Sequence, residues 1–230
     1  MYIELRNISF QYAKSELSVF EKMDCRIEGP GFHALFGPSG VGKTTFAKIL
    51  SGEITGGAGE TNRSGKSRIL YTYNLERLPN WASIGAHYEK IISPLRKEQL
   101  KDLVDAFGLS DCLESHFSQL SLGQRNRANL TRYLVQDFDL LIMDESLANV
   151  DETTKNRIIL KIKEVFPKKT FLYISHNVVE VSRFCKRIFV LREPRKMPQV
   201  VPVTGMDFSG GGDSDRKSIE HIMLEIMHAA

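Results

Sequence analysis

Apolar and polar residues alternate near the start of the chain, over residues 3–6 and 8–12, with a one-residue shift of phase between the two segments. This alternation is typical of strands with one buried face, and it predicts an antiparallel sheet. From residue 32 onward the apolar runs are continuous, over residues 32–36, 140–143 and 171–174, and helical spacing follows each of them. Continuous runs are typical of parallel strands that helices cover on both faces. The pattern therefore predicts an α/β fold in which an antiparallel β segment precedes a parallel βαβ core.

One helix is predicted clearly in the middle of the chain, at residues 94–107, where apolar residues recur at helical spacing. Pro94 suits the first turn of this helix, and Gly108 follows it as a C-cap. We place the helix in a mostly helical subdomain at about 75–137, which follows a strand at 68–73 and interrupts the core.

The end of the chain has a different pattern from the core. A glycine run at 210–212 predicts a flexible joint. It precedes a helix with one apolar stripe, formed by Ile219, Ile222, Met223, Ile226 and Met227. We therefore divide the chain into one domain at 1–204 and, at 205–230, the joint and a C-terminal helix that should dock on another surface.

Composition bounds the class of protein. With 230 residues, 42% of them hydrophobic, the chain can bury one sizeable core and is not expected to be disordered. The net charge of +3 is mild, and basic residues are interspersed with acidic ones, so the charge does not favour nucleic acid over any other acidic partner, and no nucleic-acid partner is expected.

The cysteines and the apolar runs indicate a compartment. Cys25, Cys112 and Cys185 are widely spaced and odd in number, which favours reduced thiols over a disulfide framework or a zinc site and indicates the cytosol. No apolar run approaches the roughly 18 residues that cross a bilayer, and the start of the chain is typical of a strand rather than of a signal peptide. Any role at a membrane would then depend on a partner.

The strongest chemical signal directly follows the apolar run 32–36. It matches the phosphate-loop pattern G-x-x-x-x-G-K-[ST], with the residues Gly37, Pro38, Ser39, Gly40, Val41, Gly42, Lys43 and Thr44. In such a loop glycines let backbone N–H groups surround a phosphate chain, the lysine reaches the β and γ oxygens, and the last hydroxyl is offered to Mg²⁺. The alternative is a glycine-rich turn. The strand before the loop and the helical spacing after it favour nucleotide binding, with Thr45 as a further contact.

Two adjacent carboxylates end the apolar run at 140–143, about a hundred residues after Lys43. Active sites of open α/β sheets lie at the carboxyl ends of parallel strands. We therefore predict that Asp144 holds Mg²⁺ through a water, and that Glu145 lies where a hydrolytic water attacks the γ-phosphorus. Lys43 and Mg²⁺ would stabilise the charge of the transition state. An Asp-Glu pair at a solvated turn is the alternative interpretation.

A further segment, Leu120-Ser121-Leu122-Gly123-Gln124, precedes helical spacing that runs through Leu130 and Leu134. A serine and a glycine at a helix start can form an anion site, although an ordinary capped helix would have the same residues. Here the chain resembles the ATP-binding-cassette (ABC) ATPases, whose signature is Leu-Ser-Gly-Gly-Gln, with Leu122 in place of the first glycine. The resemblance implies that Ser121, Gly123 and Gln124 close on the γ-phosphate bound by an opposing subunit.

Other positions match the same family in order along the chain. His176 ends an apolar run and is similar to the switch histidine that contacts the γ-phosphate, although a lone histidine at a strand end is more often structural. Asp151 matches the D-loop aspartate that links two nucleotide sites, and it also suits the N-cap of a helix. Tyr12 resembles the aromatic residue that stacks on adenine, and a strand-end tyrosine without a ligand is the alternative. Asn74 stands where the family has a glutamine that senses Mg²⁺; its amide is one methylene shorter, so a bridging water is an alternative to direct ligation.

The ordered set of motifs covers residues 1 to about 195. It implies a RecA-like P-loop NTPase core with a helical subdomain, and a transport-coupled ATPase that uses ATP and Mg²⁺. It also implies a head-to-tail homodimer with ATP at its interface, on the cytoplasmic face of a membrane, bound to integral membrane permease subunits. Residues 77–84 and 190–195 look most like ATPases of the nitrate, sulfonate and taurine importers.

Two alternatives stay open at this point. One is a soluble ABC ATPase of the iron–sulfur assembly type, because such proteins have about this size. The other is an ATP-gated clamp with little turnover, which Leu122 and Asn74 would favour and which Glu145 and His176 argue against.

Overall fold

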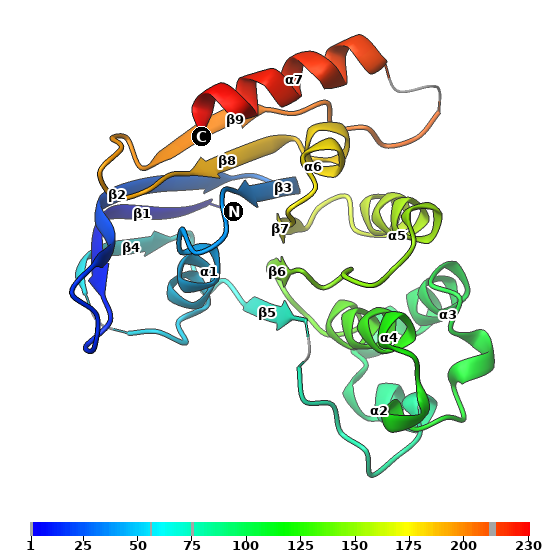
Figure 1. The fold of residues 1–230 in the computed structure, drawn as a ribbon. Helices are drawn as coiled ribbons and strands as arrows, with labels where there is room; N and C mark the ends of the chain where they lie inside the picture. Colours follow the sequence, from blue (N-terminus) through cyan, green and yellow to red (C-terminus); the bar gives the residue numbers. More distant parts are fainter. Residues whose placement is uncertain (1, 56, 75, 212–214) are drawn as a thin grey trace.

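The continuous apolar segments form the centre of a six-stranded sheet, in the order β5-β6-β7-β3-β8-β9 (Figure 1). The computed structural model describes residues 2–55, 57–74, 76–211 and 215–230. Neighbouring strands in this sheet run parallel, except that β9 is antiparallel to β8. The strands are β3 (Gly31–Phe36), β5 (Ile69–Tyr73), β6 (Leu140–Asp144), β7 (Thr170–Ile174), β8 (Arg187–Leu191) and β9 (Val200–Thr204). The carboxyl ends of β3, β5, β6 and β7 therefore meet along one edge of the sheet.

The start of the chain forms a separate three-stranded antiparallel sheet, in the order β2-β1-β4. Its strands are β1 (Tyr2–Gln11), β2 (Ser18–Glu28) and β4 (Ala58–Arg63). The two predicted strands at 3–6 and 8–12 are one strand, and the shift of phase between them is a bulge. Asn7 has a φ of 50° at this point, the pairing with β2 shifts beyond Leu5, and the Asn7 N–H donates to Asp24 Oδ1 at 2.8 Å.

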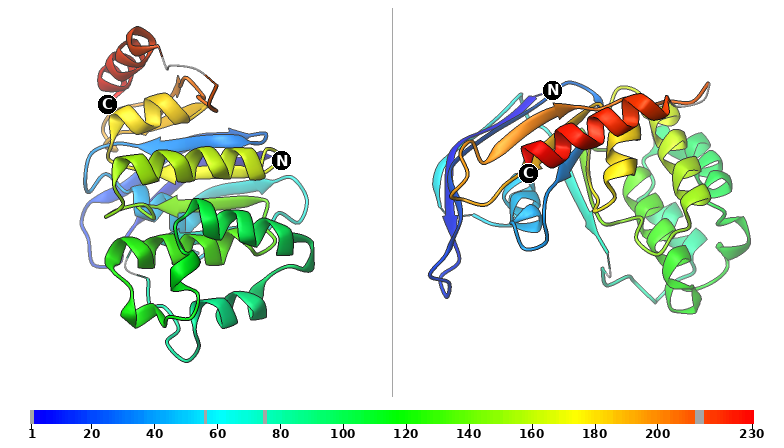
Figure 2. Two further views of the ribbon diagram at one scale, coloured as in Figure 1. Left: turned by 90° about the vertical axis from the view of Figure 1, so that its right-hand side faces the viewer. Right: turned by 45° about the horizontal axis from the view of Figure 1, so that its top comes forward.

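Helices cover both faces of the six-stranded sheet (Figure 2). On one face α1 (Lys43–Ser51) lies between the two sheets, where Phe46 and Leu50 are fully buried in a cluster that includes residues of β1, β2 and β6. On the other face α5 (Glu152–Val165) and α6 (Val178–Phe184) pack against β7. The predicted α/β class, with its antiparallel β segment and helical region, is confirmed.

The helical region lies between β5 and β6. It contains α2 (Ile84–Ile91), α3 (Lys97–Ala106) and α4 (Leu122–Leu134), with short 3₁₀ turns η1 (Pro94–Arg96), η2 (Ser110–Cys112) and η3 (Phe117–Gln119). The prediction of one continuous helix at 94–107 is wrong in its first turn, because Arg96 has φ −119° and ψ 9°, outside helical values. The Arg96 guanidinium donates to the Leu134 carbonyl at 2.8 Å, and this tertiary contact accompanies the break. Residue 75, where the predicted subdomain begins, lies outside the described residues, and the boundaries 75–137 stay a prediction.

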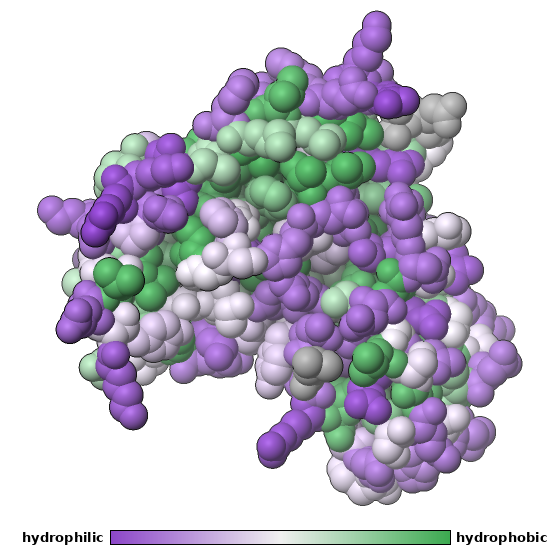
Figure 3. Space-filling view, in the orientation of Figure 1, coloured by the Kyte–Doolittle hydropathy of each residue, from purple (hydrophilic) through white to green (hydrophobic). Residues whose placement is uncertain are grey.

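The C-terminal helix α7 (Arg216–Ala229) packs on α6 and on the edge strand β9 (Figure 1). Ile226 is fully buried in this contact, whereas Met227 is 66% exposed. Figure 3 shows polar residues on the outer side of α7 and apolar residues beneath it. Gly212 of the predicted joint lies outside the described residues, and the division at residue 204 stays a prediction.

The three cysteines are buried and none forms a disulfide. In the described ranges, no helix combines the length and the apolar character needed to cross a bilayer.

Candidate functional site

The loop between β3 and α1 has two positions at which neighbouring atoms leave no room for a side chain. Gly37 has a φ of 156°, and a Cβ there would lie 2.4 Å from the Leu191 carbonyl oxygen. Gly42 has a φ of 108°, and its Cβ would lie 2.6 Å from Val19 Cγ1. Both angles are reached easily only by glycine. The loop is thus pressed against the end of β8 and the start of β2, which fixes it at the edge of the sheet.

Lys43 folds back on this loop. Its Nζ donates to the carbonyl oxygens of Gly37 and Pro38, each at 2.8 Å. The side chain is buried, and burial lowers the pKa of the ammonium group. Carbonyl oxygens satisfy the buried cation here, and a phosphate oxygen is a stronger acceptor for the same group.

Asp144 accepts two hydrogen bonds at one carboxylate oxygen. Thr44 Oγ1 donates to Oδ2 at 2.9 Å, and the Tyr71 hydroxyl donates to the same oxygen at 3.0 Å. Burial raises the pKa of Asp144, and these two hydrogen bonds oppose that rise. The last residue of the phosphate loop and the end of β6 are thereby joined.

The sequence does not predict Tyr71 as a site residue. Its position on β5, opposite Ile142 of β6, brings its hydroxyl to Asp144. The only available signal was a tyrosine on a strand otherwise predicted to be buried, and this residue type is common in strands for packing alone.

Glu145 and His176 lie side by side beyond the ends of β6 and β7. His176 Nε2 is 2.6 Å from Glu145 Oε1, and both side chains are partly exposed. Glu145 has a φ of 50°, an unusual value for a residue with a side chain, and its N–H donates to the Ile174 carbonyl at 3.1 Å. A non-glycine residue held in this way at a strand end is typical of a functional position.

These side chains surround a cavity of about 310 Å³. It is lined by Ser39, Gly40, Gly42, Lys43, Thr44, Thr45, Asp144, Glu145 and His176. The phosphate loop, the carboxylate pair and the histidine are therefore brought together, as the sequence predicts.

A second cavity of about 360 Å³ shares Thr44, Asp144 and Glu145 with the first, and it extends to Asn74. The Asn74 carboxamide oxygen accepts a hydrogen bond from Asn126 Nδ2 at 3.2 Å. Asn74 is thus beside the carboxylates, but its oxygen contacts α4. A role for Asn74 as a metal ligand stays a prediction.

Tyr12 lies close to the phosphate loop. Its hydroxyl is 3.0 Å from Thr45 Oγ1, the residue is 45% exposed, and its ring stands edge-on to Phe10. An exposed ring at this place can stack on a base whose phosphates lie in the loop.

The remaining predicted residues line neither cavity. Ser121 and Gln124 form a capping box at the start of α4, with bonds of 2.9 and 3.2 Å. Asp151 caps α5 by accepting the Thr154 N–H at 2.9 Å, and this bond lowers the pKa of its carboxyl group. Ser121, Gly123, Gln124 and Asp151 therefore do not meet the phosphate loop within one chain.

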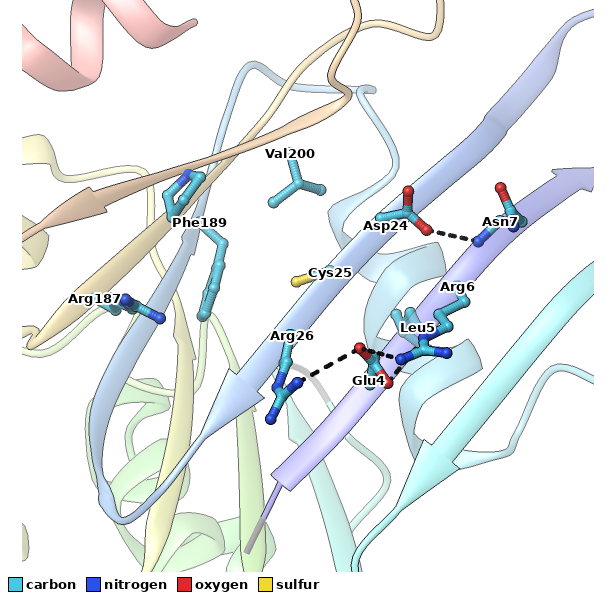
Figure 4. A pocket seen from close by; sticks show the side chains of 11 residues that line it. Glu4, Leu5, Arg6, Asn7, Asp24, Cys25, Arg26, Arg187, Phe189 and Val200 are labelled. Carbon is cyan, nitrogen blue, oxygen red and sulfur yellow. Dashed lines mark hydrogen bonds and ion pairs between the residues drawn. The ribbon is translucent and has the colours of Figure 1, made fainter.

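A larger cavity, of about 490 Å³, lies elsewhere, between the β1–β2 pair and β8–β9 (Figure 4). Its carboxylates have partners within the chain: Glu4 pairs with Arg6 and Arg26, and Asp24 accepts the Asn7 N–H. It has no glycine loop and no carboxylate at a strand end, so we do not assign the nucleotide to it.

The residues at the first cavity fit Mg²⁺. Thr44 and Asp144 present hydroxyl and carboxylate oxygens at one point, and Mg²⁺ prefers such ligands together with water and phosphate oxygens. Within the described ranges, no cluster of three or more His, Cys, Asp or Glu side chains has the form of a metal site built from protein ligands alone.

Comparison with known proteins agrees with this geometry. A family model described as ABC transporter matches residues 20–148. An uncharacterized ABC transporter ATP-binding protein of Haemophilus influenzae is 31% identical over 185 residues, which cover 77% of each protein. An aliphatic sulfonates import ATP-binding protein of Agrobacterium fabrum is 28% identical and covers 83% of this chain and 71% of its own length.

A solved structure supports the fold. It is a dimeric ATP-binding cassette in a post-hydrolysis state bound to ADP and Pi, with a TM-score of 0.70 and 20% identity. The match covers 84% of this chain and 95% of that one.

Proposed function

This chain belongs to the ABC transporter family, and from that premise we propose how its own residues bind and hydrolyse ATP. The chain is an ATP-hydrolysing subunit of such a transporter. The observation that carries the proposed mechanism is the hydrogen bond from Thr44 to Asp144, with the Glu145–His176 pair beside it. It joins the phosphate-binding loop to two carboxylates and an imidazole within one small cavity.

In the proposed site, the residues of the phosphate loop surround the triphosphate of ATP with backbone N–H groups. Lys43 leaves the carbonyl oxygens of its own loop and contacts the β and γ oxygens. Tyr12 stacks on the adenine ring. Thr44 and Asp144 would hold Mg²⁺, which when bound neutralises charge on the phosphate oxygens.

Glu145 orients the attacking water and accepts its proton as the bond to the γ-phosphorus forms. His176, at 2.6 Å from Glu145, fixes that carboxylate and contacts the γ-phosphate. The products are ADP and inorganic phosphate. The contact between Glu145 and His176 favours turnover over the alternative of a clamp that binds ATP without hydrolysis.

The site is completed by a second copy of the chain in our proposal. Ser121, Gly123 and Gln124 lie apart from the phosphate loop of their own chain, yet they form a partly exposed helix start that suits an anion. A head-to-tail homodimer would place this helix start on the γ-phosphate of the other subunit, with Asp151 beside the two-fold axis. ATP binding would close the dimer, and hydrolysis would open it.

The membrane partner is proposed to be an integral permease, contacted through residues 74–95 from the cytoplasmic face. Transport is favoured over iron–sulfur assembly because the matching family is that of ABC transporters. The importer group stays a proposal, since the sulfonate relative is no more similar than the one from Haemophilus influenzae.

The test is Glu145→Gln, which keeps the shape of the side chain and removes the base. We expect this variant to bind ATP, to lose at least about a hundredfold in turnover, and to elute as a dimer with MgATP in size-exclusion chromatography. Glu164→Gln, at an exposed carboxylate on α5, is the matched control and should hydrolyse ATP like the natural chain. Full turnover by Glu145→Gln would remove Glu145 from the mechanism, and a monomer at saturating MgATP would contradict the shared site.

A further inference from the structure

Asn126 on α4 connects two parts of the site that are far apart in sequence. Its Nδ2 donates to the Ala148 carbonyl oxygen at 2.6 Å and to Asn74 Oδ1 at 3.2 Å. The side chain is buried, with 7% of its surface exposed. Ala148 belongs to the loop between β6 and α5, and Asn74 follows β5.

The chemistry of the contacts determines how the two amides are oriented. A backbone carbonyl can only accept, so Asn126 must direct its NH₂ group towards Ala148. The same NH₂ group faces Asn74, so Asn74 must present its oxygen there. The two hydrogens of Asn126 Nδ2 therefore match two acceptors, and the NH₂ group of Asn74 points away from α4.

A second contact holds the start of α4 against the same loop. A Cβ on Gly123 would lie 2.6 Å from the Asn149 carbonyl oxygen, so α4 and the loop touch with no room for a side chain. Asn149 itself has a φ of 61°. Gly123 and Asn126 are three residues apart and lie on one face of the helix. The start of α4 and the loop are thus in contact at two adjacent points.

The loop residue that Asn126 holds is one turn from Glu145. The Ala148 N–H donates to the Glu145 carbonyl at 2.9 Å, while the Ala148 carbonyl accepts from Asn126. Glu145 has a φ of 50°, an angle that persists only where surrounding contacts impose it. Ser146 adds a bond from its hydroxyl to the Thr72 carbonyl at 3.2 Å.

We propose that Asn126 is a positioning residue for ATP hydrolysis: its NH₂ group sets the turn that carries Glu145 and ties it, together with Asn74, to the start of α4. The inference rests on the proposed function of Glu145. Asn126 touches neither nucleotide nor water in this role. Through Asn126, the position of the α4 start depends on the turn that carries Glu145. In the proposed dimer, the nucleotide of the second subunit would lie at this helix start.

The first test is a double-mutant cycle on ATP turnover with Asn126→Ala, Asn74→Ala and both together. Asn126→Ala should lower kcat about three- to tenfold, the range expected when the hydrogen bond that holds the turn carrying Glu145 is lost. The KM for ATP should change less than twofold, since the phosphate loop is untouched. The double variant should lose less than the product of the two single losses, because the hydrogen bond between Asn74 and Asn126 is already absent in either single variant.

Asn129→Ala is the matched control on the same helix. Asn129 is equally buried, but its Nδ2 donates to Thr72 and Glu76 and reaches neither Asn74 nor Ala148. In a double variant with Asn74→Ala, the loss of kcat should equal the product of the losses in the two single variants.

A second test needs no nucleotide. Hydrogen–deuterium exchange of the nucleotide-free chain should show residues 146–150 exchanging about tenfold faster in Asn126→Ala and unchanged in Asn129→Ala. Asn126→Asp keeps the shape but sets a carboxylate oxygen against the Ala148 carbonyl, and it should accelerate exchange in the same segment. If Asn126→Ala does not fold, Asn126→Asp supplies both readouts.

The outcomes separate the two claims. A natural chain that fails to hydrolyse ATP would contradict the proposed function, and the exchange experiment would still test the contact itself. If the natural chain hydrolyses ATP while both Asn126 variants keep its kcat and its exchange pattern, the role of Asn126 is overturned. An additive cycle between positions 74 and 126 would overturn the proposed link to Asn74.

Discussion

At the residue scale, the Asp144 carboxylate has its two oxygens in different surroundings. Oδ2 accepts from Thr44 and Tyr71, whereas no hydrogen bond to Oδ1 is found among the described residues. Thr44 has to share its hydroxyl with a metal ion if one is bound, and the Tyr71 phenol then remains as a donor to Oδ2. Burial raises the pKa of Asp144, so each donor matters for keeping the group ionised.

We predict that Tyr71→Phe lowers the affinity of the site for Mg²⁺ without abolishing Mg²⁺ binding. Losing the phenol removes a bond that lowers the pKa of Asp144, so that pKa rises further. Protonated Asp144 is a poor metal ligand; activity should therefore fall at a higher pH on the acid side of the profile. Because the lost hydrogen bond was made to a charged group, the Mg²⁺ concentration needed for half-maximal ATPase activity should rise roughly tenfold in this variant. Magnesium titrations at several pH values measure both effects.

Tyr73→Phe is the control for this prediction. Tyr73 lies on the same strand, is 41% exposed and makes an aromatic contact with Tyr71, but no described residue accepts its hydroxyl proton. Its magnesium dependence should match that of the natural chain. If Tyr71→Phe also matches, the phenol has no role at the carboxylate.

At the element scale, α7 covers the edge of the main sheet and braces α6. His176 precedes α6 directly, and the start of α6 is fixed by the buried Glu180, which contacts Lys155, Tyr173 and Ser175. Asn177 caps the helix by accepting the N–H groups of Val179 and Glu180. The position of His176 therefore depends on how the β7–α6 connection is packed.

Replacing Ile226 by alanine should show whether α7 contributes to stability. Ile226 is fully buried, so Ile226→Ala should lower the free energy of unfolding by about 2–5 kcal/mol. Met227→Ala, at the neighbouring exposed side chain, should change it by less than about 0.5 kcal/mol. Urea denaturation followed by circular dichroism measures the difference. Equal midpoints for the two variants would mean that α7 does not dock on the core in solution.

At the scale of the whole molecule, the phosphate loop and the start of α4 belong to different parts of one chain. β5 and the segment after it connect the core with the helical region, and Glu76 bonds to Asn129, Arg132 and Tyr133 of α4. Asn129 Nδ2 also donates to Thr72 on β5, and Asn126 Nδ2 donates to the Ala148 carbonyl, so polar contacts attach α4 to the core. The composite site that we propose between two copies would use both parts.

Mixing complementary variants tests that arrangement, with Glu145→Gln present in both to prevent turnover. Lys43→Ala should lose nucleotide affinity, and Ser121→Arg should keep it but block the helix start. Neither should dimerise alone with MgATP, whereas their mixture should form a heterodimer with one intact composite site, visible by light scattering. A mixture that stays monomeric while Glu145→Gln alone dimerises would contradict the head-to-tail arrangement.

Much of the site is predictable from the sequence because its signals are local. A phosphate loop is defined by consecutive residues, and Asp144, Glu145 and His176 each end an apolar run. In a parallel sheet the ends of such runs meet at one edge, so their convergence follows from the fold class alone. The helix caps at Ser121 and Asp151 are equally local, since a cap bonds to residues two or three positions ahead.

Contacts between segments that are distant in the sequence could not be predicted and are known only from the tertiary structure. The phase shift at Asn7 corresponds to a bulge in which Asp24 accepts the Asn7 N–H. The predicted helix at 94–107 is interrupted at Arg96, which donates to the Leu134 carbonyl. Tyr71 and Asn126 have no distinguishing pattern of their own. Their proposed roles depend on the groups that face them, which are the Asp144 carboxylate for Tyr71 and the Ala148 carbonyl for Asn126. Strand register and helix packing determine those contacts, rather than neighbours in the chain.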